Sequence, residues 1–197
     1  MYIRDALYVK NHTCGLAPIL QADGGERIKI LELGAGCGIV GIAFAQCFPN
    51  CQVELTDQNE AQELLSRNLK QAATGQNSSL LHRTLNWEDE EDVPSADEAH
   101  ELRLVIVSDC TYNADSCPDL VRMLVKISSS STSTRILVAM KRRHDSEDIF
   151  FDLMEKTDLR CLLKTIVELP CDESVVNDID TQIELYLFAC DEGSIIS

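Results

Sequence analysis

Apolar and polar positions along this chain follow two periods, one typical of strands and one typical of helices. Apolar runs and alternating apolar positions predict seven strands, at 29–33, 52–56, 79–85, 104–107, 135–140, 161–169 and 182–190. Apolar residues three and four positions apart predict helices at 39–47, 59–73, 117–127 and 146–157. Between them, residues 88–101 hold eight acidic residues and no Lys or Arg, which predicts a solvated loop or a short helix.

Strands that alternate with helices predict one α/β domain over residues 1–197, a sandwich with a mostly parallel sheet. The run Leu104–Val107 is apolar throughout, as expected for a strand with helices on both faces. No helix pattern separates the last two strands, so we expect them to be antiparallel and joined by Pro170–Thr181. The first 25 residues are poorly patterned, apart from a turn or two of helix over Leu16–Gln21.

Composition narrows the class of protein. The formal net charge of −16 argues against nucleic acid as the main partner, because phosphate binding needs a basic face. It permits a basic protein partner, although acidity more often serves solubility. The nine cysteines form no Cys-x-x-Cys pair, so we expect free thiols, no metal site and a reducing compartment, the cytoplasm or also the nucleus. We find no secretory signal and no membrane span, and no indication of an oligomer, so a monomer is assumed.

The strongest chemical signal is the turn after the first strand, Glu32-Leu-Gly34-Ala35-Gly36-Cys-Gly38. A strand that ends in a glycine-rich turn before a helix predicts a nucleotide-like ligand across the turn. A dinucleotide fingerprint would need glycine where Ile39 stands, and the Glu32 carboxylate would repel a pyrophosphate. The same carboxylate suits a ligand with an ammonium and a sulfonium, which describes S-adenosylmethionine. The alternative is an ordinary tight strand-to-helix turn.

Further polar residues follow the next two strands. Asp57 ends the second strand, where a carboxylate can take both hydroxyls of a ribose, and Gln58 would border the same pocket. An alternative role for Asp57 is a helix N-cap. Asn86 and Trp87, the only tryptophan, follow the third strand. A single aromatic residue is most often core, but at this edge of the sheet Trp87 could stack beside an adenine.

The segment Ser108-Asp109-Cys-Thr-Tyr112 follows the fourth strand, which we expect to lie beside the first. Ligands of open parallel sheets bind at the carboxyl ends of such strands. Asp109 and Tyr112 would therefore stand beside the reactive end of the ligand.

Taken together, the glycine turn, Asp57, Asn86-Trp87 and Asp109-Cys-Thr-Tyr112 resemble the seven-strand S-adenosylmethionine-dependent methyltransferases of family 16, lysine methyltransferases with an Asp-x-x-Tyr motif. The resemblance implies a Rossmann-like sandwich in which the cofactor is held by Gly34, Ala35, Gly36, Asp57, Trp87 and Ser108. The expected cofactor site also includes Glu32, Gly38, Gln58 and Asn86, which belong to the same sequence segments. It implies that Asp109 and Tyr112 face the incoming amine. From the chemistry of the step, we expect Asp109 to orient the amine while water removes its proton. The basic stretch Lys141-Arg142-Arg143 also resembles one in several members, although surface pairing with acids is the simpler interpretation.

The expected function is therefore methylation of a lysine side chain on a protein substrate. Small-molecule N-methylation and a non-catalytic binding module remain the alternatives. Two features depart from the family pattern. The N-terminal part is short and holds no tryptophan, so Tyr8 or His12 would have to cover the cofactor in part, and Asn86 stands where an acid is common.

Overall fold

The structure is a computed structural model that describes residue 19 and residues 27–143, 146–168 and 182–191. Its strands, within these residues, are β1 (Ile28–Leu33), β2 (Cys51–Asp57), β3 (Ser79–Thr84), β4 (Leu102–Ser108), β5 (Arg135–Met140), β6 (Leu159–Glu168) and β7 (Gln182–Cys190). Its helices are α2 (Ile39–Cys47), α3 (Gln62–Gln71), α4 (Ala96–Glu101), α5 (Cys117–Ser129) and α6 (Ser146–Met154), with two 3₁₀ turns, η2 (Asn59–Ala61) and η3 (Glu90–Asp92). The seven predicted strands are thus confirmed. Leu16–Gln21, Tyr8, His12 and the connection Pro170–Thr181 lie outside the described residues, apart from Ile19.

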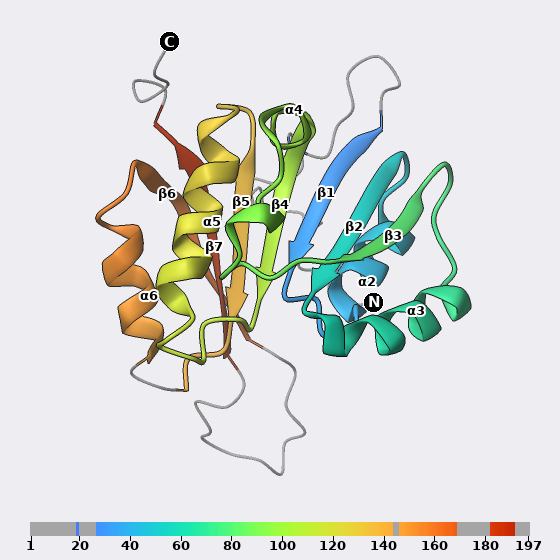
Figure 1. The fold of residues 1–197 in the computed structure, drawn as a ribbon, viewed down its shortest axis with the longest axis horizontal. Coiled ribbons are helices and arrows are strands. Elements are labelled where there is room, and N and C mark those ends of the chain that lie inside the picture. Colours follow the sequence, from blue (N-terminus) through green and yellow to red (C-terminus); the bar gives the residue numbers. More distant parts are fainter. Residues whose placement is uncertain (1–18, 20–26, 144–145, 169–181, 192–197) are drawn as a thin grey trace.

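The strands form one sheet in the order β3-β2-β1-β4-β5-β7-β6. The first five pair in parallel, and β7 is antiparallel to both β5 and β6. The prediction of a mostly parallel sheet with an antiparallel final pair is therefore confirmed. Residues Leu33 of β1 and Val107 of β4 are register partners, so the glycine turn and the segment after Ser108 leave the sheet side by side (Figure 1).

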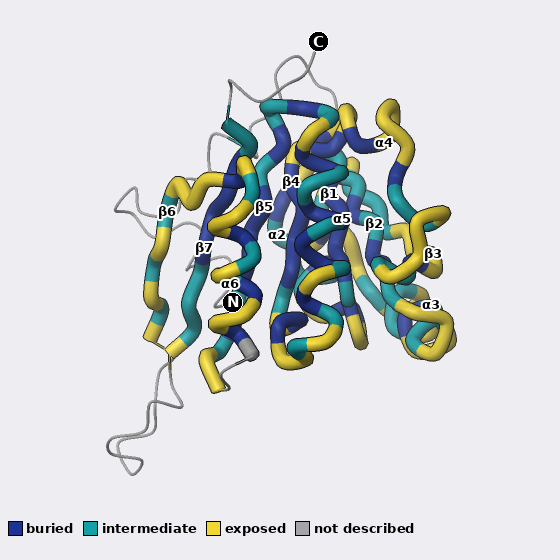
Figure 2. The backbone as a smooth tube through the Cα atoms, turned by 60° about the vertical axis from the view of Figure 1, so that its left-hand side comes forward, coloured by how far each residue is buried: buried dark blue, intermediate teal, exposed yellow. Residues whose placement is uncertain are grey.

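Two apolar clusters cover the two faces of the sheet. On one face, Ile30 and Val53 pack with Phe44 of α2 and Leu65 of α3. On the other face, Leu31, Val105 and Val107 pack with side chains of α5 and α6 such as Leu120 and Phe150. Figure 2 shows the result: the central strand β4 is buried, whereas the edge strand β6 carries many exposed residues. Strand residues alternate between the faces, so each buried strand contributes to both clusters.

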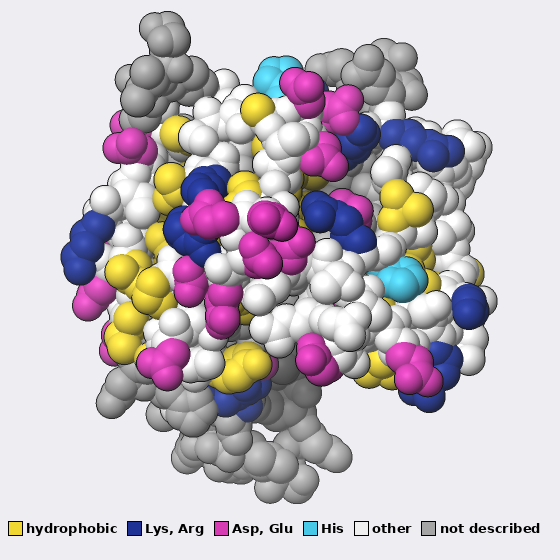
Figure 3. Space-filling model, viewed as in Figure 1, with side chains coloured by type: hydrophobic (Ala, Val, Ile, Leu, Met, Phe, Trp, Pro, Cys, Tyr) yellow, Lys and Arg dark blue, Asp and Glu magenta, His cyan; other side chains and the backbone are white. Residues whose placement is uncertain are grey.

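The acidic segment 88–101 is more ordered than a solvated loop. It forms η3 and α4, and Ser95 and Glu98 make a capping box at the start of α4. Glu90 pairs with Arg122 and Lys126 of α5, and Glu101 pairs with Lys29 of β1. Figure 3 shows acidic side chains gathered near the middle of this face, next to Lys and Arg side chains. Several of the acids therefore attach the segment to the sheet and to α5.

Two findings concern wider properties of the described part of the chain. It contains no helix that is both long and apolar enough to cross a bilayer, and no group of three His, Cys, Asp or Glu residues arranged for a metal ion. Its seven cysteines are free thiols.

Candidate functional site

The glycine turn between β1 and α2 is built from residues in left-handed backbone conformations. Gly34, Gly36 and Gly38 have φ of 65°, 56° and 81°. A Cβ on Gly34 would lie 2.6 Å from Cys110 Sγ and 3.0 Å from the Trp87 ring, so the segments after β3 and β4 close directly onto the turn. The glycine at position 34 is thus required both by its backbone angle and by its neighbours.

Gly36, by contrast, faces open space. A Cβ placed there would meet no atom within 4 Å. Its N–H donates to Asp57 Oδ2 at 2.7 Å, and the other carboxylate oxygen, Oδ1, accepts from the Gln58 N–H at 2.7 Å. The turn therefore presents open backbone beside an anchored carboxylate, an arrangement that fits the predicted nucleoside ligand. The ribose role of Asp57 stays a prediction, but its position beside the glycine turn is as predicted.

Glu32 differs from the expectation of a carboxylate that faces a cationic ligand. Its side chain is only 1% exposed and points to α2, where Oε2 accepts the Gly41 N–H at 2.8 Å. Burial raises its pKa to about 8, and the negative charge of Asp57 adds to this effect against the opposing Gly41 hydrogen bond. Glu32 is consequently largely protonated at neutral pH. The charge attraction that we assigned to it from the sequence is not supported, and its direct role in ligand binding stays a prediction.

Trp87 is held at the turn from two sides. Its ring lies over Gly34, where it occupies the space that a side chain at position 34 would need. Its backbone carbonyl accepts a hydrogen bond from Arg122 Nη2 of α5 at 2.8 Å. Within the described residues its indole Nε1 is buried without a hydrogen-bond partner. An unpaired buried donor is costly, so a ligand or a rearrangement that brings an acceptor there would be favoured. Sequence analysis missed Arg122, because only the tertiary fold brings it to Trp87.

The other predicted residues of the cofactor site are arranged around this centre. Ala35 is buried and its N–H donates to Thr56 O of β2 at 2.9 Å. Asn86 is held by the acidic segment, since its N–H donates to Asp92 Oδ2 at 2.6 Å. Ser108 is half-buried at the end of β4, where its carbonyl lies 3.2 Å from Cys110 Sγ. Gln58 is exposed at the rim.

Asp109 and Tyr112 follow β4, as the sequence placed them. Asp109 takes a left-handed conformation, with φ of 56°, and its N–H donates to Ala139 O of β5 at 2.8 Å. Its carboxylate is half-exposed and pairs with Arg143, whose Nη1 lies 3.0 Å from Oδ2. Tyr112 is 66% exposed. Both candidate residues are thus exposed after β4, and Asp109 is paired with Arg143, which the sequence had left to general surface pairing.

Cys110 fills the space between Asp109 and the turn. Its thiol is 3.4 Å from the Leu33 carbonyl oxygen, and burial raises its pKa to about 12, with a smaller contribution from Glu32. The thiol is therefore neutral and acts as packing, not as a nucleophile.

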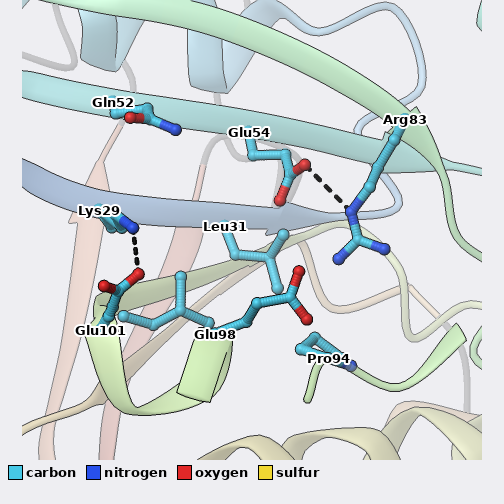
Figure 4. A pocket seen from close by; sticks show the side chains of 9 residues that line it. Lys29, Leu31, Gln52, Glu54, Arg83, Pro94, Glu98 and Glu101 are labelled. Atoms are coloured by element: carbon cyan, nitrogen blue, oxygen red, sulfur yellow. Dashed lines mark hydrogen bonds and ion pairs between the residues drawn. The ribbon is translucent and has the colours of Figure 1, made fainter. Parts of the chain in front are cut away.

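A separate pocket of about 170 Å³ lies elsewhere on the sheet (Figure 4). It is lined by residues of β1, β2, β3, α4 and the start of β4 together with Pro94, and none of them is a predicted site residue. Four of its charged side chains pair with one another, Lys29 with Glu101 and Arg83 with Glu54. These pairs satisfy the charges that a ligand would need, so we do not assign it a binding role.

Comparison with known proteins relates the whole arrangement to one family. A family model described as lysine methyltransferase matches residues 1–157. A UPF0665 family protein of Schizosaccharomyces pombe is 33% identical over 64% of this chain and 37% of its own length. Protein N-lysine methyltransferase METTL21A of Xenopus tropicalis is 29% identical over 66% of this chain and 57% of its own, and protein-lysine N-methyltransferase EFM6 of Saccharomyces cerevisiae is 29% identical over 66% and 59%. The chain thus spans between about a third and three fifths of the length of these relatives.

Solved structures agree on the fold. Magnesium protoporphyrin IX methyltransferase from Synechocystis, solved with bound SAM, has a TM-score of 0.60 at 11% identity, covering 96% of this chain and 79% of that one. A predicted O-methyltransferase from Agrobacterium tumefaciens has a TM-score of 0.61 at 17% identity, covering 88% and 79%. At such identities the likeness establishes a Rossmann-like methyltransferase fold and nothing finer.

Proposed function

The chain belongs to the lysine methyltransferase family, and from this membership we propose that it transfers a methyl group from S-adenosylmethionine to a lysine side chain of a protein. The observation that carries the proposal is the contact between the Asp57 carboxylate and the Gly36 N–H, beside open space at the turn. The names of relatives such as METTL21A and EFM6 support the protein-lysine substrate.

In this proposal the turn and the strand ends hold the cofactor. Gly34, Ala35 and Gly36 pass under its methionine part, Asp57 binds the ribose hydroxyls, and Trp87 lies near the adenine. The bound cofactor supplies an electrophilic methyl group on a sulfonium. The protein contributes alignment, which is a large part of catalysis for an in-line displacement.

We assign the binding of the acceptor lysine to Asp109 and Tyr112. A lysine side chain has a pKa of roughly 10.4 and arrives protonated, so it must lose a proton before it can attack. Asp109 attracts and orients the ammonium, Tyr112 offers a ring face or a hydroxyl acceptor, and water takes the proton. Asp109 is half-exposed, which leaves it accessible to a side chain from a partner protein.

The free cysteines support a cytoplasmic protein, with the nucleus as a second compartment. We further propose that it acts as a monomer on a protein substrate, and that neither nucleic acid nor a membrane is a partner.

Calorimetry with S-adenosylmethionine, followed by incubation of tritiated cofactor with a heat-treated cell lysate, tests the proposal. We expect the protein to bind the cofactor and to transfer label into a protein band. Asp109→Asn should bind the cofactor as the parent does but lose most of the transfer, because Asn keeps the left-handed backbone and removes the charge. Asp97→Asn on the exposed face of α4 is the matched control.

The outcomes separate the alternatives. Label that enters only small molecules would point to a small-molecule methyltransferase. Absence of cofactor binding at millimolar concentration would favour a non-catalytic module. Full transfer by Asp109→Asn would refute the role of Asp109.

A further inference from the structure

In the ion pair between Arg143 and Asp109, a single nitrogen of the guanidinium contacts the carboxylate. Arg143 Nη1 lies 3.0 Å from Oδ2 and 3.3 Å from Oδ1 of Asp109, so one nitrogen bridges both oxygens. Each oxygen therefore keeps a lone pair for a second donor. The two side chains are 44% and 49% exposed, and exposed pairs of this kind contribute little to folding stability.

A second contact fixes where Arg143 stands. Its backbone N–H donates to both carboxylate oxygens of Glu147, at 3.0 Å and 2.8 Å, and Glu147 is 3% exposed in the first turn of α6. Its neighbour Arg142 pairs instead with Asp148 and Glu184 and lies over the Phe151 ring. Two adjacent arginines thus have separate partners, and only one of the two is aimed at the candidate site.

This inference rests on the proposed function. We propose that Arg143 is a positioning residue for the acceptor: it shares the Asp109 carboxylate with the substrate lysine and favours the neutral, nucleophilic form of that lysine. An ammonium that meets an isolated carboxylate is stabilised in its charged form, whereas a second cation on the same carboxylate offsets this stabilisation. The neighbouring positive charge of Arg143 consequently lowers the pKa of the bound lysine, as neighbouring cations do for catalytic lysines.

The chemical step then balances with groups already named. The ammonium loses its proton to water at the half-exposed site, and the free amine lone pair forms the N–C bond with the methyl carbon. The C–S bond breaks at the same time, and the sulfur keeps the electron pair. Asp109 holds the amine. Arg143 limits how strongly the Asp109 carboxylate stabilises the protonated form of the lysine.

Other titratable groups lie on the elements next to Asp109, since β4 pairs with β1 and with β5. Those at the strand ends are Glu32 of β1, which is largely protonated at neutral pH, Asp57 of β2, and the neutral thiol of Cys110. Tyr112 follows β4, and Lys141, Arg142 and Glu147 lie on the segment from β5 into α6. The interaction on which this inference rests is the ion pair between the Asp109 carboxylate and Arg143.

The test is the pH dependence of methyl transfer. Initial rates of tritium transfer from S-adenosylmethionine into the acceptor band of a heat-treated lysate, kept dilute so that rates follow kcat/KM, are measured between pH 6.5 and 9.5. We compare the parent with Arg143→Gln, Arg143→Lys and, as the matched control, Arg142→Gln. Calorimetry should show that all four bind the cofactor within about twofold of one another, since both arginines are exposed.

For Arg143→Gln we expect the rising limb of the profile to move up by about one pH unit, so that transfer at pH 7.5 falls about tenfold and approaches the parent rate at pH 9.5. Arg143→Lys should restore the parent profile, and Arg142→Gln should leave it unchanged. A uniform loss at every pH, a profile that superimposes on that of the parent, or a faster rate at neutral pH would each overturn the inference while leaving the proposed function intact. A parent protein that labels no acceptor would overturn both.

Discussion

The buried carboxylate of Glu32 makes folding stability depend on pH in a way that one substitution can isolate. Its side chain is 1% exposed, and burial raises its pKa from 4.5 to about 8. Glu32→Gln retains an amide oxygen that can accept the Gly41 N–H in place of Oε2, but it carries no titratable group. The amide also places two N–H donors in the core, where the protonated carboxyl has one O–H donor, and this is a pH-independent cost.

The sign of the effect follows from proton binding. In the unfolded chain Glu32 titrates near 4.5, and in the folded protein near 8, so the folded state holds the extra proton between these values. Stability is therefore greatest below the unfolded pKa and falls as the pH rises through this window. The slope is about 1.4 kcal/mol per pH unit, so the parent should lose about 3 kcal/mol from this group between roughly pH 5.5 and 8.

Urea denaturation at pH 5.5, 7 and 8 measures this loss, with the fluorescence of Trp87, the only tryptophan, as the signal. The difference in unfolding free energy between Glu32→Gln and the parent should shift in favour of the variant by about 3 kcal/mol over this range. Glu60→Gln, an exposed carboxylate on η2, controls for the general loss of a negative charge. A difference that stays constant with pH would show that Glu32 is ionised in the folded protein, and the burial argument would be wrong.

Three further predictions concern the turn and its neighbours. Asp57→Ala should weaken S-adenosylmethionine binding by about tenfold or more, because it removes a charge-assisted hydrogen-bond acceptor. Calorimetry measures this change, and an affinity equal to that of the parent would exclude the ribose role. Gly34→Ala should lower the unfolding free energy by about 2 kcal/mol or more, because the φ of 65° at this position disfavours a side chain and the new Cβ would lie 2.6 Å from Cys110 Sγ. An unchanged denaturation midpoint would contradict this packing. In the native protein at pH 8, iodoacetamide should label the exposed Cys37 well before Cys110, because burial and a pKa of about 12 keep Cys110 a thiol. Peptide mass spectrometry measures the two labelling rates, and equal rates would refute the burial of Cys110.

The sequence alone determined the elements of the fold and the location of the candidate site. Strand and helix periodicity are local, so β5 and β7 begin and end at the predicted residues, and no strand end differs from its predicted position by more than two residues. Residues that follow parallel strands meet at one edge, which placed Asp57, Trp87 and Asp109 near the glycine turn before any coordinates.

Only the tertiary structure decided which acidic groups are ionised and which charged side chains pair. The sequence showed an acid at position 32, but only the packing of α2 against β1 buries it and raises its pKa. The sequence showed a basic stretch, but only the approach of the β5–α6 segment to the end of β4 selects Arg143 as the partner of Asp109. Arg122 reaches Trp87 across 35 residues of chain in the same way. Local sequence patterns show how apolar and polar positions alternate, which is enough to predict strands and helices. Ionisation and ion pairing depend instead on burial and on distances between segments that are far apart in sequence.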